Sequence, residues 1–215
     1  IPLVFYGENE AEYGNAINEN ESAQRNLDYF ALDTDSTNEL YFGGIPITDL
    51  PEYGIAIGEM DPYLPASPDT LIDAKTEVHY LGYYLKWVPQ NNYYYSVEQI
   101  GFEANEFRTE GTYSKYNSID DKTDSYHYWT TLIKFGLGRA SYDAAQEIRN
   151  QHIERSEGIA LVHRYDQEFP RRYFQEFLEY LDLTEEQFFK IAESFRSPHL
   201  WKQVNGEWQL RHQVS

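Results

Sequence analysis

The pattern of hydrophobic and polar positions divides the chain near residue 75. Residues 1–7 form a short apolar run that Gly7 ends, which predicts a buried strand of the parallel type. Such a strand needs neighbours on both sides, and the run starts at Ile1 without an initiator methionine. We therefore expect the fold to continue upstream of this residue. The aromatic, β-favouring residues 78–87 predict another strand.

Residues 8–74 are polar, acidic and rich in Asn, Gly and Pro, which predicts an irregular insertion with one or two short helices. Within it, residues 21–32 have helical character, and Ser67 before Pro68 is a typical helix start. Residues 1–74 hold 15 acidic residues and one basic residue, whereas residues 75–215 hold 21 and 16. The two segments are expected to have different roles.

Helical patterns with clear start and stop signals dominate the second segment. Thr184 and Gln187 form a capping box that opens a helix to about residue 195. Asn205-Gly206 lies between two short β-favouring runs and predicts a hairpin. Further helices are predicted from Pro89 to Gly101 and over residues 120–136, 141–151, 156–166 and 171–181.

Composition excludes several classes of function. The net charge of −19 argues against nucleic-acid binding, which needs clustered Lys and Arg. Without cysteines the chain has no disulfides or thiolate metal sites. The sequence also lacks a run of 18 apolar residues, so we predict no membrane-spanning helix. Because no two His residues have metal-ligand spacing, we predict no zinc site. Aromatic residues make up 17% of the chain and provide for a large core.

The densest group of charged residues lies in the loop 108–122. Such a loop, held between helices, is a place where binding groups gather. The alternative is a solvated loop whose two adjacent aspartates cap the next helix. The charged residues that argue for binding are Arg108, Glu110, Lys115, Asp120, Asp121 and Lys122.

The segment Lys134-Phe-Gly-Leu-Gly-Arg139 predicts a turn whose backbone amides can approach an anion. Lys134 and Arg139 flank its two glycines, so the turn suits binding of a phosphate or a carboxylate. In the alternative interpretation Gly136 only ends a helix and Lys134 stabilises its C-terminus.

Asp143 and Glu147 are four residues apart and share a helix face. Paired carboxylates can act as acid and base or hold Mg²⁺, although ordinary surface charges give the same pattern. His127 lies in an aromatic run, which favours a packed ring over a metal ligand.

Taken in order, the motifs of the chain resemble those of the N-acetyl sugar amidotransferases. The opening Pro2-Leu-Val and Tyr6-Gly-Glu-Asn9 is similar to that family's strand ending in a Gly-Glu-Asn turn. The other motifs are His79-Tyr-Leu-Gly-Tyr-Tyr-Leu-Lys-Trp87, Arg108-Thr-Glu-Gly-Thr-Tyr-Ser-Lys-Tyr116, Asp120-Asp-Lys122, Ile133-Lys-Phe-Gly-Leu-Gly-Arg-Ala140, Glu147-Ile-Arg149 and Tyr165-Asp166.

The resemblance implies an α/β fold: the end of a parallel-sheet PP-loop domain (adenine nucleotide alpha hydrolase-like), followed by a mainly helical C-terminal region. Residues 1–14 would finish the nucleotide domain, 15–75 form the insertion, and 76–215 the substrate and catalytic region. It implies a cytoplasmic enzyme of O-antigen or surface-sugar biosynthesis that uses ATP and Mg²⁺. Its partners would be a nucleotide-linked N-acetyl sugar and ammonia-supplying glutaminase/cyclase-like subunits.

Within this hypothesis the predicted site draws on both ends of the chain. Glu8 and Asn9 follow the first strand, where open α/β sheets bind ligands. The predicted catalytic residues are Lys134, Glu8 and Asp143. Lys134 would contact the pyrophosphate leaving group, and Arg139 a sugar carboxylate or diphosphate. The predicted substrate-binding residues are Arg139, Lys115, Arg108, Glu110, Arg149, Asn9 and Lys86, and Asp120 and Asp121 are the predicted Mg²⁺ ligands.

The family's Ser-Gly-Gly-x-Asp-Ser PP-loop and its N-terminal cysteines are absent from this sequence, and Gly43-Gly44 lacks the flanking Ser and Asp. We therefore expect a fragment that does not turn over ATP alone. Two other classes stay open: a glycan-binding module that uses the many Tyr and Trp rings, and a scaffold whose acidic first segment docks a basic partner.

Overall fold

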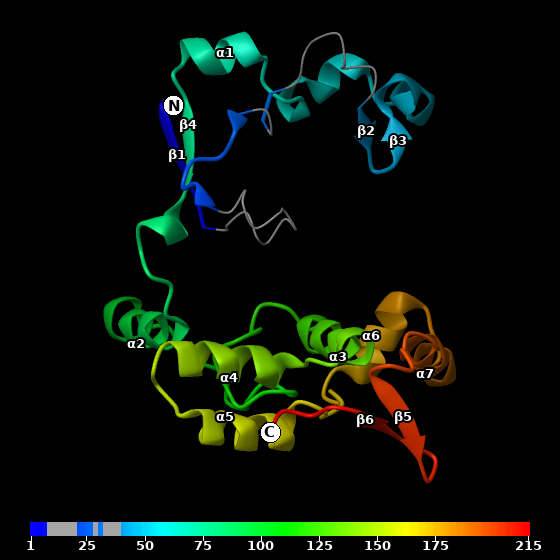
Figure 1. Ribbon diagram of the computed structural model, residues 1–215. Helices are drawn as coiled ribbons and strands as arrows, with labels where there is room; N and C mark the ends of the chain where they lie inside the picture. The colour runs from blue at the N-terminus through cyan, green and yellow to red at the C-terminus, as the bar shows by residue number, and fades with distance from the viewer. Residues whose placement is uncertain (8–20, 28–29, 32–39) are drawn as a thin grey trace. The chain divides into compact units, whose positions relative to one another are not determined.

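The computed structural model describes residues 1–7, 21–27, 30–31 and 40–215, and it divides into two compact units (Figure 1). The first unit is Ile1–Trp87 and the second is Val88–Ser215. The fold is mixed α/β, with a small parallel sheet in the first unit and helices throughout the second.

The first unit is built around a parallel strand pair. Strand β1 (Leu3–Tyr6) pairs in parallel with β4 (Glu77–Tyr80). These are the two strands predicted at residues 1–7 and 78–87. The second strand is shorter than predicted, because a 3₁₀ turn, η7 (Leu81–Tyr83), follows it at once. The expectation of a buried β1 is wrong for this unit: Leu3 and Phe5 are 48% and 49% exposed.

The helix predicted over residues 21–32 is wrong for the described part of that range. Gln24 instead makes an antiparallel bridge to His79, and Arg25 N–H donates to the Val78 carbonyl at 2.8 Å. Long-range pairing with β4 therefore takes the backbone groups that a helix would use internally. The segment behaves as a short edge of the sheet.

The rest of the first unit consists of small elements. Gly43-Gly44 forms the turn between β2 (Tyr41–Phe42) and β3 (Ile45–Pro46). Two 3₁₀ helices follow, η5 (Ile47–Tyr53) and η6 (Ile57–Tyr63), and their buried cluster contains Ile47, Leu50 and Met60. The predicted start of α1 (Pro68–Asp73) is confirmed, since Thr70 N–H donates to Ser67 Oγ at 3.3 Å.

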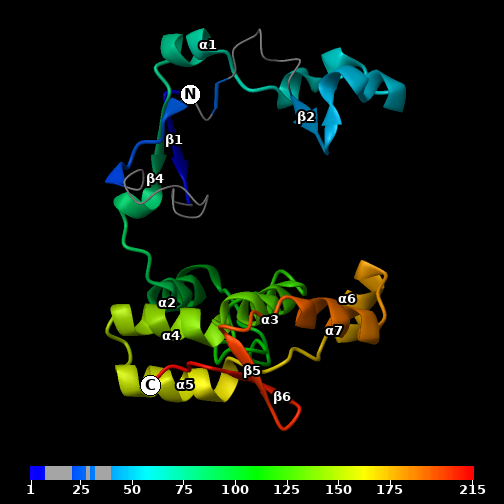
Figure 2. The ribbon, with the colours of Figure 1, turned by 45° about the vertical axis from the view of Figure 1, so that its right-hand side comes forward.

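The second unit contains six α-helices and a terminal hairpin among its described elements (Figure 2). Helices α4 and α5 lie side by side in both ribbon views. The predicted Asn205-Gly206 turn is confirmed between β5 and β6. The bounds are α2 (Pro89–Ile100), α3 (Asp124–Phe135), α4 (Arg139–Arg149), α5 (Arg155–Tyr165), α6 (Phe174–Leu181), α7 (Glu185–Ser194), β5 (Trp201–Val204) and β6 (Glu207–Leu210).

Local capping explains where two of these helices depart from prediction. Helix α3 begins at Asp124 rather than residue 120, because Asp121 accepts from both Thr123 N–H and Thr123 Oγ1 in a turn before the helix. Helix α6 begins at Phe174 rather than residue 171, and Glu110 binds the backbone amides just before it. The capping box of Thr184 and Gln187 opens α7 as predicted.

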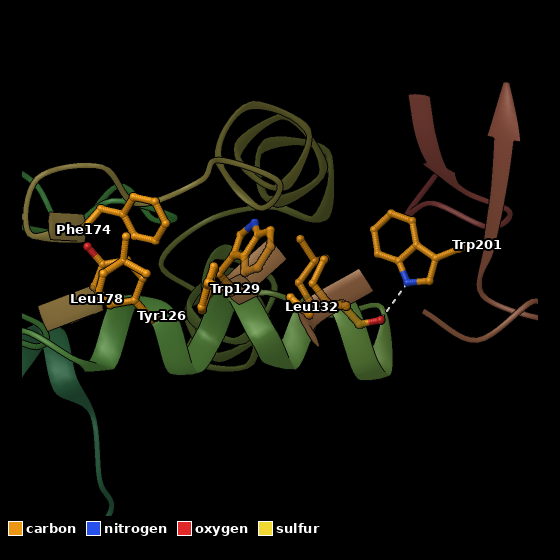
Figure 3. Packing of buried hydrophobic residues seen from close by; sticks show 9 residues of the cluster. Tyr126, Trp129, Leu132, Phe174, Leu178 and Trp201 are labelled. Atoms are coloured by element: carbon orange, nitrogen blue, oxygen red, sulfur yellow. Dashed lines mark hydrogen bonds between the residues drawn. The ribbon is translucent and has the colours of Figure 1, made fainter. Parts of the chain in front are cut away.

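Aromatic side chains form the core of the second unit (Figure 3). The Tyr126 and Phe177 rings stack with centroids 4.0 Å apart, and Trp129 meets Phe169 edge to face at 4.9 Å. Trp201 is buried from the hairpin side, and its indole N–H donates to the Ile133 carbonyl at 2.7 Å. This core ties α3, α6, α7 and the hairpin into one framework.

Candidate functional site

The loop 108–122 is fixed to the segment after α5 by an arginine–carboxylate pair. Arg108 donates to both oxygens of Glu168, each at 2.6 Å, and its guanidinium lies 4.6 Å from the centre of the Tyr165 ring. The Gly111 amide donates to the same carboxylate at 2.8 Å. These hydrogen bonds lower the pKa of Glu168, with Arg108 the main cause, and the same pair raises the pKa of Arg108.

A second carboxylate of this loop binds backbone rather than an external ligand. Glu110 accepts from the amides of Arg171 and Arg172, both at 3.0 Å. Arg108 and Glu110, both predicted to bind substrate, are thus engaged with the segment 168–172. Their observed contacts brace the loop.

Asp143 is the hub of a third set of contacts. Its Oδ2 accepts from Thr112 Oγ1 at 2.5 Å and from Asn117 Nδ2 at 3.3 Å, while Oδ1 accepts from Arg139 Nε at 3.1 Å. Glu147, its predicted carboxylate partner, is instead paired with His152 Nδ1 at 2.6 Å. The predicted acid–base pair is therefore divided between two local networks.

Arg139 lies between two carboxylates of its own chain. Its guanidinium contacts Asp143 and also Asp124 at 3.2 Å, and it lies 4.2 Å from the centre of the Tyr128 ring. The side chain is only 14% exposed. A cation this enclosed, with two anions already in place, is poorly available to a substrate anion.

One amide of the predicted anion-binding turn, that of Gly138, donates to a carboxylate of the chain itself, Asp166. The carboxylate accepts from Gly138 N–H at 3.0 Å and from Ser141 N–H at 2.8 Å, and Ser141 Oγ donates to it at 2.9 Å. A Cβ at Gly138 would lie 2.7 Å from the Asp166 carbonyl oxygen, which explains the glycine. Gly136 ends α3 in a left-handed conformation, as the alternative interpretation expected.

Lys134 has a different setting from the braced loop. It belongs to the last turn of α3, and its Nζ lies 5.2 Å from the centre of the Phe135 ring. The side chain lines an apolar groove whose other walls come from α6 and α7. Among the described residues, the structure does not bring Lys134 together with the groups that contact Arg139.

The remaining predicted residues are dispersed. Lys115 Nζ donates to the Glu106 carbonyl at 3.0 Å, whereas Arg149 is exposed near the end of α4. Lys86 is exposed in the other unit. Glu8 and Asn9 lie outside the described residues.

The two predicted Mg²⁺ ligands, Asp120 and Asp121, have different surroundings. Asp120 is exposed, and Asp121 caps the turn before α3, which lowers its pKa through the Thr123 hydrogen bonds. No cluster of three or more His, Asp or Glu that could share a metal occurs among the described positions. Gly43-Gly44, the only Gly pair, serves as the turn of the β2–β3 hairpin.

A small polar hollow opens beside the braced loop. Its volume is about 30 Å³, enough for one or two water-sized groups but not for a sugar ring. Lys122 at its edge pairs with Glu176 at 2.6 Å and lies 5.2 Å from the centre of the Tyr173 ring. The hollow is lined by Asn105, Thr109, Glu110, Ser118, Asp121, Lys122, Ser125, Tyr126, Pro170, Arg172 and Tyr173.

Sequence reasoning missed three residues that organise this site: Asp124, Asp166 and Glu168. Each is a carboxylate whose role depends on a partner far along the chain, as in the Arg108–Glu168 pair. Asp166 alone had a signal, because it belongs to one of the motifs that carry the family resemblance.

Comparison with known proteins gives one family match, and it covers the C-terminal part of the chain. No curated protein matches the chain, and among the described residues no helix is long and apolar enough to cross a membrane. Residues 110–215, just under half of the chain, match the family described as "LPS biosynthesis protein WbpG-like, C-terminal domain". The match supports an LPS-biosynthesis, WbpG-like family for this C-terminal part of the chain.

Proposed function

We propose that the chain is the C-terminal portion of an ATP-dependent amidotransferase that converts the N-acetyl group of a nucleotide-linked sugar into an acetamidino group during O-antigen or surface-polysaccharide biosynthesis. The observation that carries the proposal is the WbpG-like match over residues 110–215. The matched part includes the turn bound by Asp166 and the hub at Asp143. The ordered motifs that resemble N-acetyl sugar amidotransferases supply the specific reaction.

In the proposed reaction the acetamido oxygen attacks the α-phosphorus of ATP, and pyrophosphate leaves. Ammonia adds to the carbon of the resulting imidate, AMP departs with the former acetamido oxygen, and loss of a proton leaves the amidine. Separate glutaminase/cyclase-like subunits would supply the ammonia in the cytoplasm. Because the described residues provide no PP-loop, we assign most of the ATP and Mg²⁺ binding to other residues of a complete protein, with Lys134 as a contact from this chain to the leaving pyrophosphate.

The part played by the second unit is to hold the sugar. The braced loop presents hydroxyl, amide and carboxylate groups around the polar hollow, and these are the groups that pair with sugar hydroxyls. The hollow would take one small substituent while the ring lies across its mouth. Lys122 and Arg172 at this edge are suited to the diphosphate, since the exposed Lys122–Glu176 pair is weak enough to exchange its partner.

The predicted role of Lys134 at the pyrophosphate is tested separately from its position on α3. In the complete enzyme, Lys134→Ala should lower turnover at saturating ATP by roughly a hundredfold without changing the melting temperature. A lower melting temperature with near-normal turnover would mean that Lys134 only stabilises the helix end.

Release of pyrophosphate tests whether this chain needs a nucleotide-binding half. Residues 1–215 alone should release none from ATP. A protein that joins them to a PP-loop domain should release it when sugar and ammonia are both present. Robust ATP cleavage by residues 1–215 alone would contradict the proposal.

A glycan-binding module is the second candidate, and exposed aromatic rings favour it. Tyr94 and Tyr95 of α2 are 61% and 67% exposed, and exposed aromatic faces can stack on sugar rings. Binding of a free oligosaccharide that Tyr94→Ala weakens, without preference for the nucleotide-linked sugar, would support the module. Charge-dependent binding of only the nucleotide-linked sugar would support the enzyme.

A further inference from the structure

An open groove of about 430 Å³ runs between α3, α6 and α7 of the second unit. Buried side chains such as Ile133 and Phe188 lie at its base. Large apolar side chains in its lining remain open to solvent: Phe135 is 58% exposed, Ile191 is 49% and Phe195 is 55%. The groove therefore continues the aromatic core to the surface.

The wall formed by α7 is apolar. Phe188, Ile191, Ala192 and Phe195 line the groove, and their spacing of three and four residues places them on one stripe of the helix. The stripe covers about two turns, or roughly 10 Å. An occupant that packs against it needs apolar side chains with a matching spacing.

The opposite wall, from α3, has the same spacing and a different chemistry. His127, Thr130, Thr131 and Lys134 line the groove at three- and four-residue intervals. Both threonine hydroxyls already donate to the His127 carbonyl, at 2.9 and 2.8 Å. Lys134 is therefore the principal charged group that this wall offers to an occupant.

Charge in the groove is opposite in sign to charge in the chain as a whole. Acidic residues outnumber basic ones by 36 to 17 in the sequence, yet no Asp or Glu is among the described residues that line the groove. Carboxylates along one edge of an occupant could therefore pair with Lys134, and no acidic residue of the lining would repel them.

From these two walls we propose that the groove is a docking site for an amphipathic helix of a partner protein, with its apolar face against α7 and an acidic edge along α3. Packing of an amphipathic helix into an apolar groove is a recurrent mode of recognition. Of the residues that line the groove, Lys134 is also a predicted catalytic residue. Peptide binding measures its role in docking, and turnover measures its role in catalysis.

The test uses residues 1–215 and two labelled helical peptides of about 18 residues, roughly five turns. Both carry leucines at three- and four-residue spacing, and one has Glu along the flank where the other has Lys. Fluorescence anisotropy at about 0.15 M salt, where charges more than about 8 Å away are largely screened, should show about threefold tighter binding of the Glu peptide. Lys134→Glu should reverse this preference, and Ile191→Glu should weaken binding of both peptides by about tenfold or more.

Matched controls come from the same helices. Lys190→Glu changes the same charge on α7 outside the lining, and Tyr180→Glu places a carboxylate on α6 at a side chain that is 78% exposed. Both variants should bind the peptides as the unchanged protein does. Circular dichroism checks the fold of the Ile191 variant, and Lys134→Glu alters only an exposed side chain.

Several results would overturn the proposal. One is an unchanged peptide preference in Lys134→Glu, and another is unchanged affinity in a folded Ile191→Glu variant. Self-association in sedimentation that Ile191→Glu abolishes would assign the groove to a second copy of the chain. Binding to phosphatidylcholine vesicles that the same change abolishes would assign it to lipid.

Discussion

The two units of the chain use their charged residues in opposite ways. Ile1–Trp87 contains 16 acidic residues and three basic residues, so few of these carboxylates can pair with a Lys or Arg of their own unit. Val88–Ser215 contains 20 acidic and 14 basic residues. In this unit the Arg108–Glu168 pair joins the loop 108–122 to the segment after α5, and the hydrogen bond from Thr112 to Asp143 joins it to α4. The larger share of basic residues lets the second unit build charged networks inside its framework.

The hydrophobic core of the second unit is also the larger of the two. The described core of the first unit centres on Ile47, Leu50 and Met60, whereas the second unit buries an aromatic cluster that includes Tyr126 and Trp129. A larger core can hold a loop rigidly, and binding groups are effective when their support is rigid. This contrast favours the second unit as the place of the site.

Removal of a large core side chain should have the largest effect and should separate the units. Trp129→Ala is expected to lower the free energy of unfolding of the second unit by about 3–5 kcal/mol, because it leaves a cavity beside Phe169 and Phe188. Hydrogen exchange should rise in peptides from residues 124–194 and stay unchanged in residues 40–80. Equal increases in both units would show that they unfold together.

The pair that braces the loop should contribute less. Glu168→Gln removes the ion pair with Arg108 and is expected to cost about 1–3 kcal/mol, toward the lower end because both side chains are about one third exposed. Folding lowers the pKa of Glu168, so its contribution is present above the unfolded pKa near 4.3 and is lost as the pH falls through the folded value. The melting temperatures of the two proteins should therefore converge in acid.

Glu103→Gln, at an exposed position, is the matched control and should melt like the unchanged protein at every pH. A difference between the Glu168→Gln variant and the unchanged protein that persists in strong acid would show that packing, rather than the ion pair, is what the substitution disturbs.

Loss of the carboxylate in the glycine turn tests whether the turn is built for an anion. Asp166→Ala should cost about 1–2 kcal/mol, since the amides of Gly138 and Ser141 lose their acceptor. Inorganic phosphate should then raise the melting temperature of this variant more than that of the unchanged protein or of Asp120→Ala. An identical response in all three would mean that the turn has no affinity for a free anion.

The smallest effects are expected at the two hairpin turns, one in each unit. Gly43 and Gly206 have φ of +60° and +85°, and a Cβ on either would have no atom within 4 Å. Alanine at either position should cost about 1 kcal/mol through backbone strain alone, each change affecting only its own unit. Gly58→Ala, with an ordinary φ and open space, should cost nothing. A loss there would implicate contacts rather than strain.

Local signals in the sequence predicted most of the second unit. The capping box at Thr184 and the Asn205-Gly206 turn both specify their elements within a few residues, and both are confirmed. In the first unit, residues 21–32 looked helical, but pairing of Gln24 with His79 overrides that preference. A contact across 55 residues leaves no local trace that a pattern could reveal.

The site was predictable only in part for the same reason. The sequence identified Arg108 and Glu110 in the loop, and Arg139 and Asp143 on the next helix, as candidate binding or catalytic residues. Their gathering around the loop is seen only in the structure. Their partners were not predictable, because Glu168 lies 60 residues from Arg108 and only the tertiary fold joins them. Groups predicted to hold substrate are for this reason found holding the loop.

Identification of the product tests the proposed amidotransferase most directly. The complete protein, with a PP-loop domain joined to residues 1–215, would be incubated with ATP, ammonia and a nucleotide-linked N-acetyl sugar. Mass spectrometry should show a product in which NH replaces the acetamido oxygen, together with equal amounts of AMP and pyrophosphate. Unchanged sugar in the presence of a folded, ATP-binding protein and a range of nucleotide-linked N-acetyl sugars would contradict the assignment.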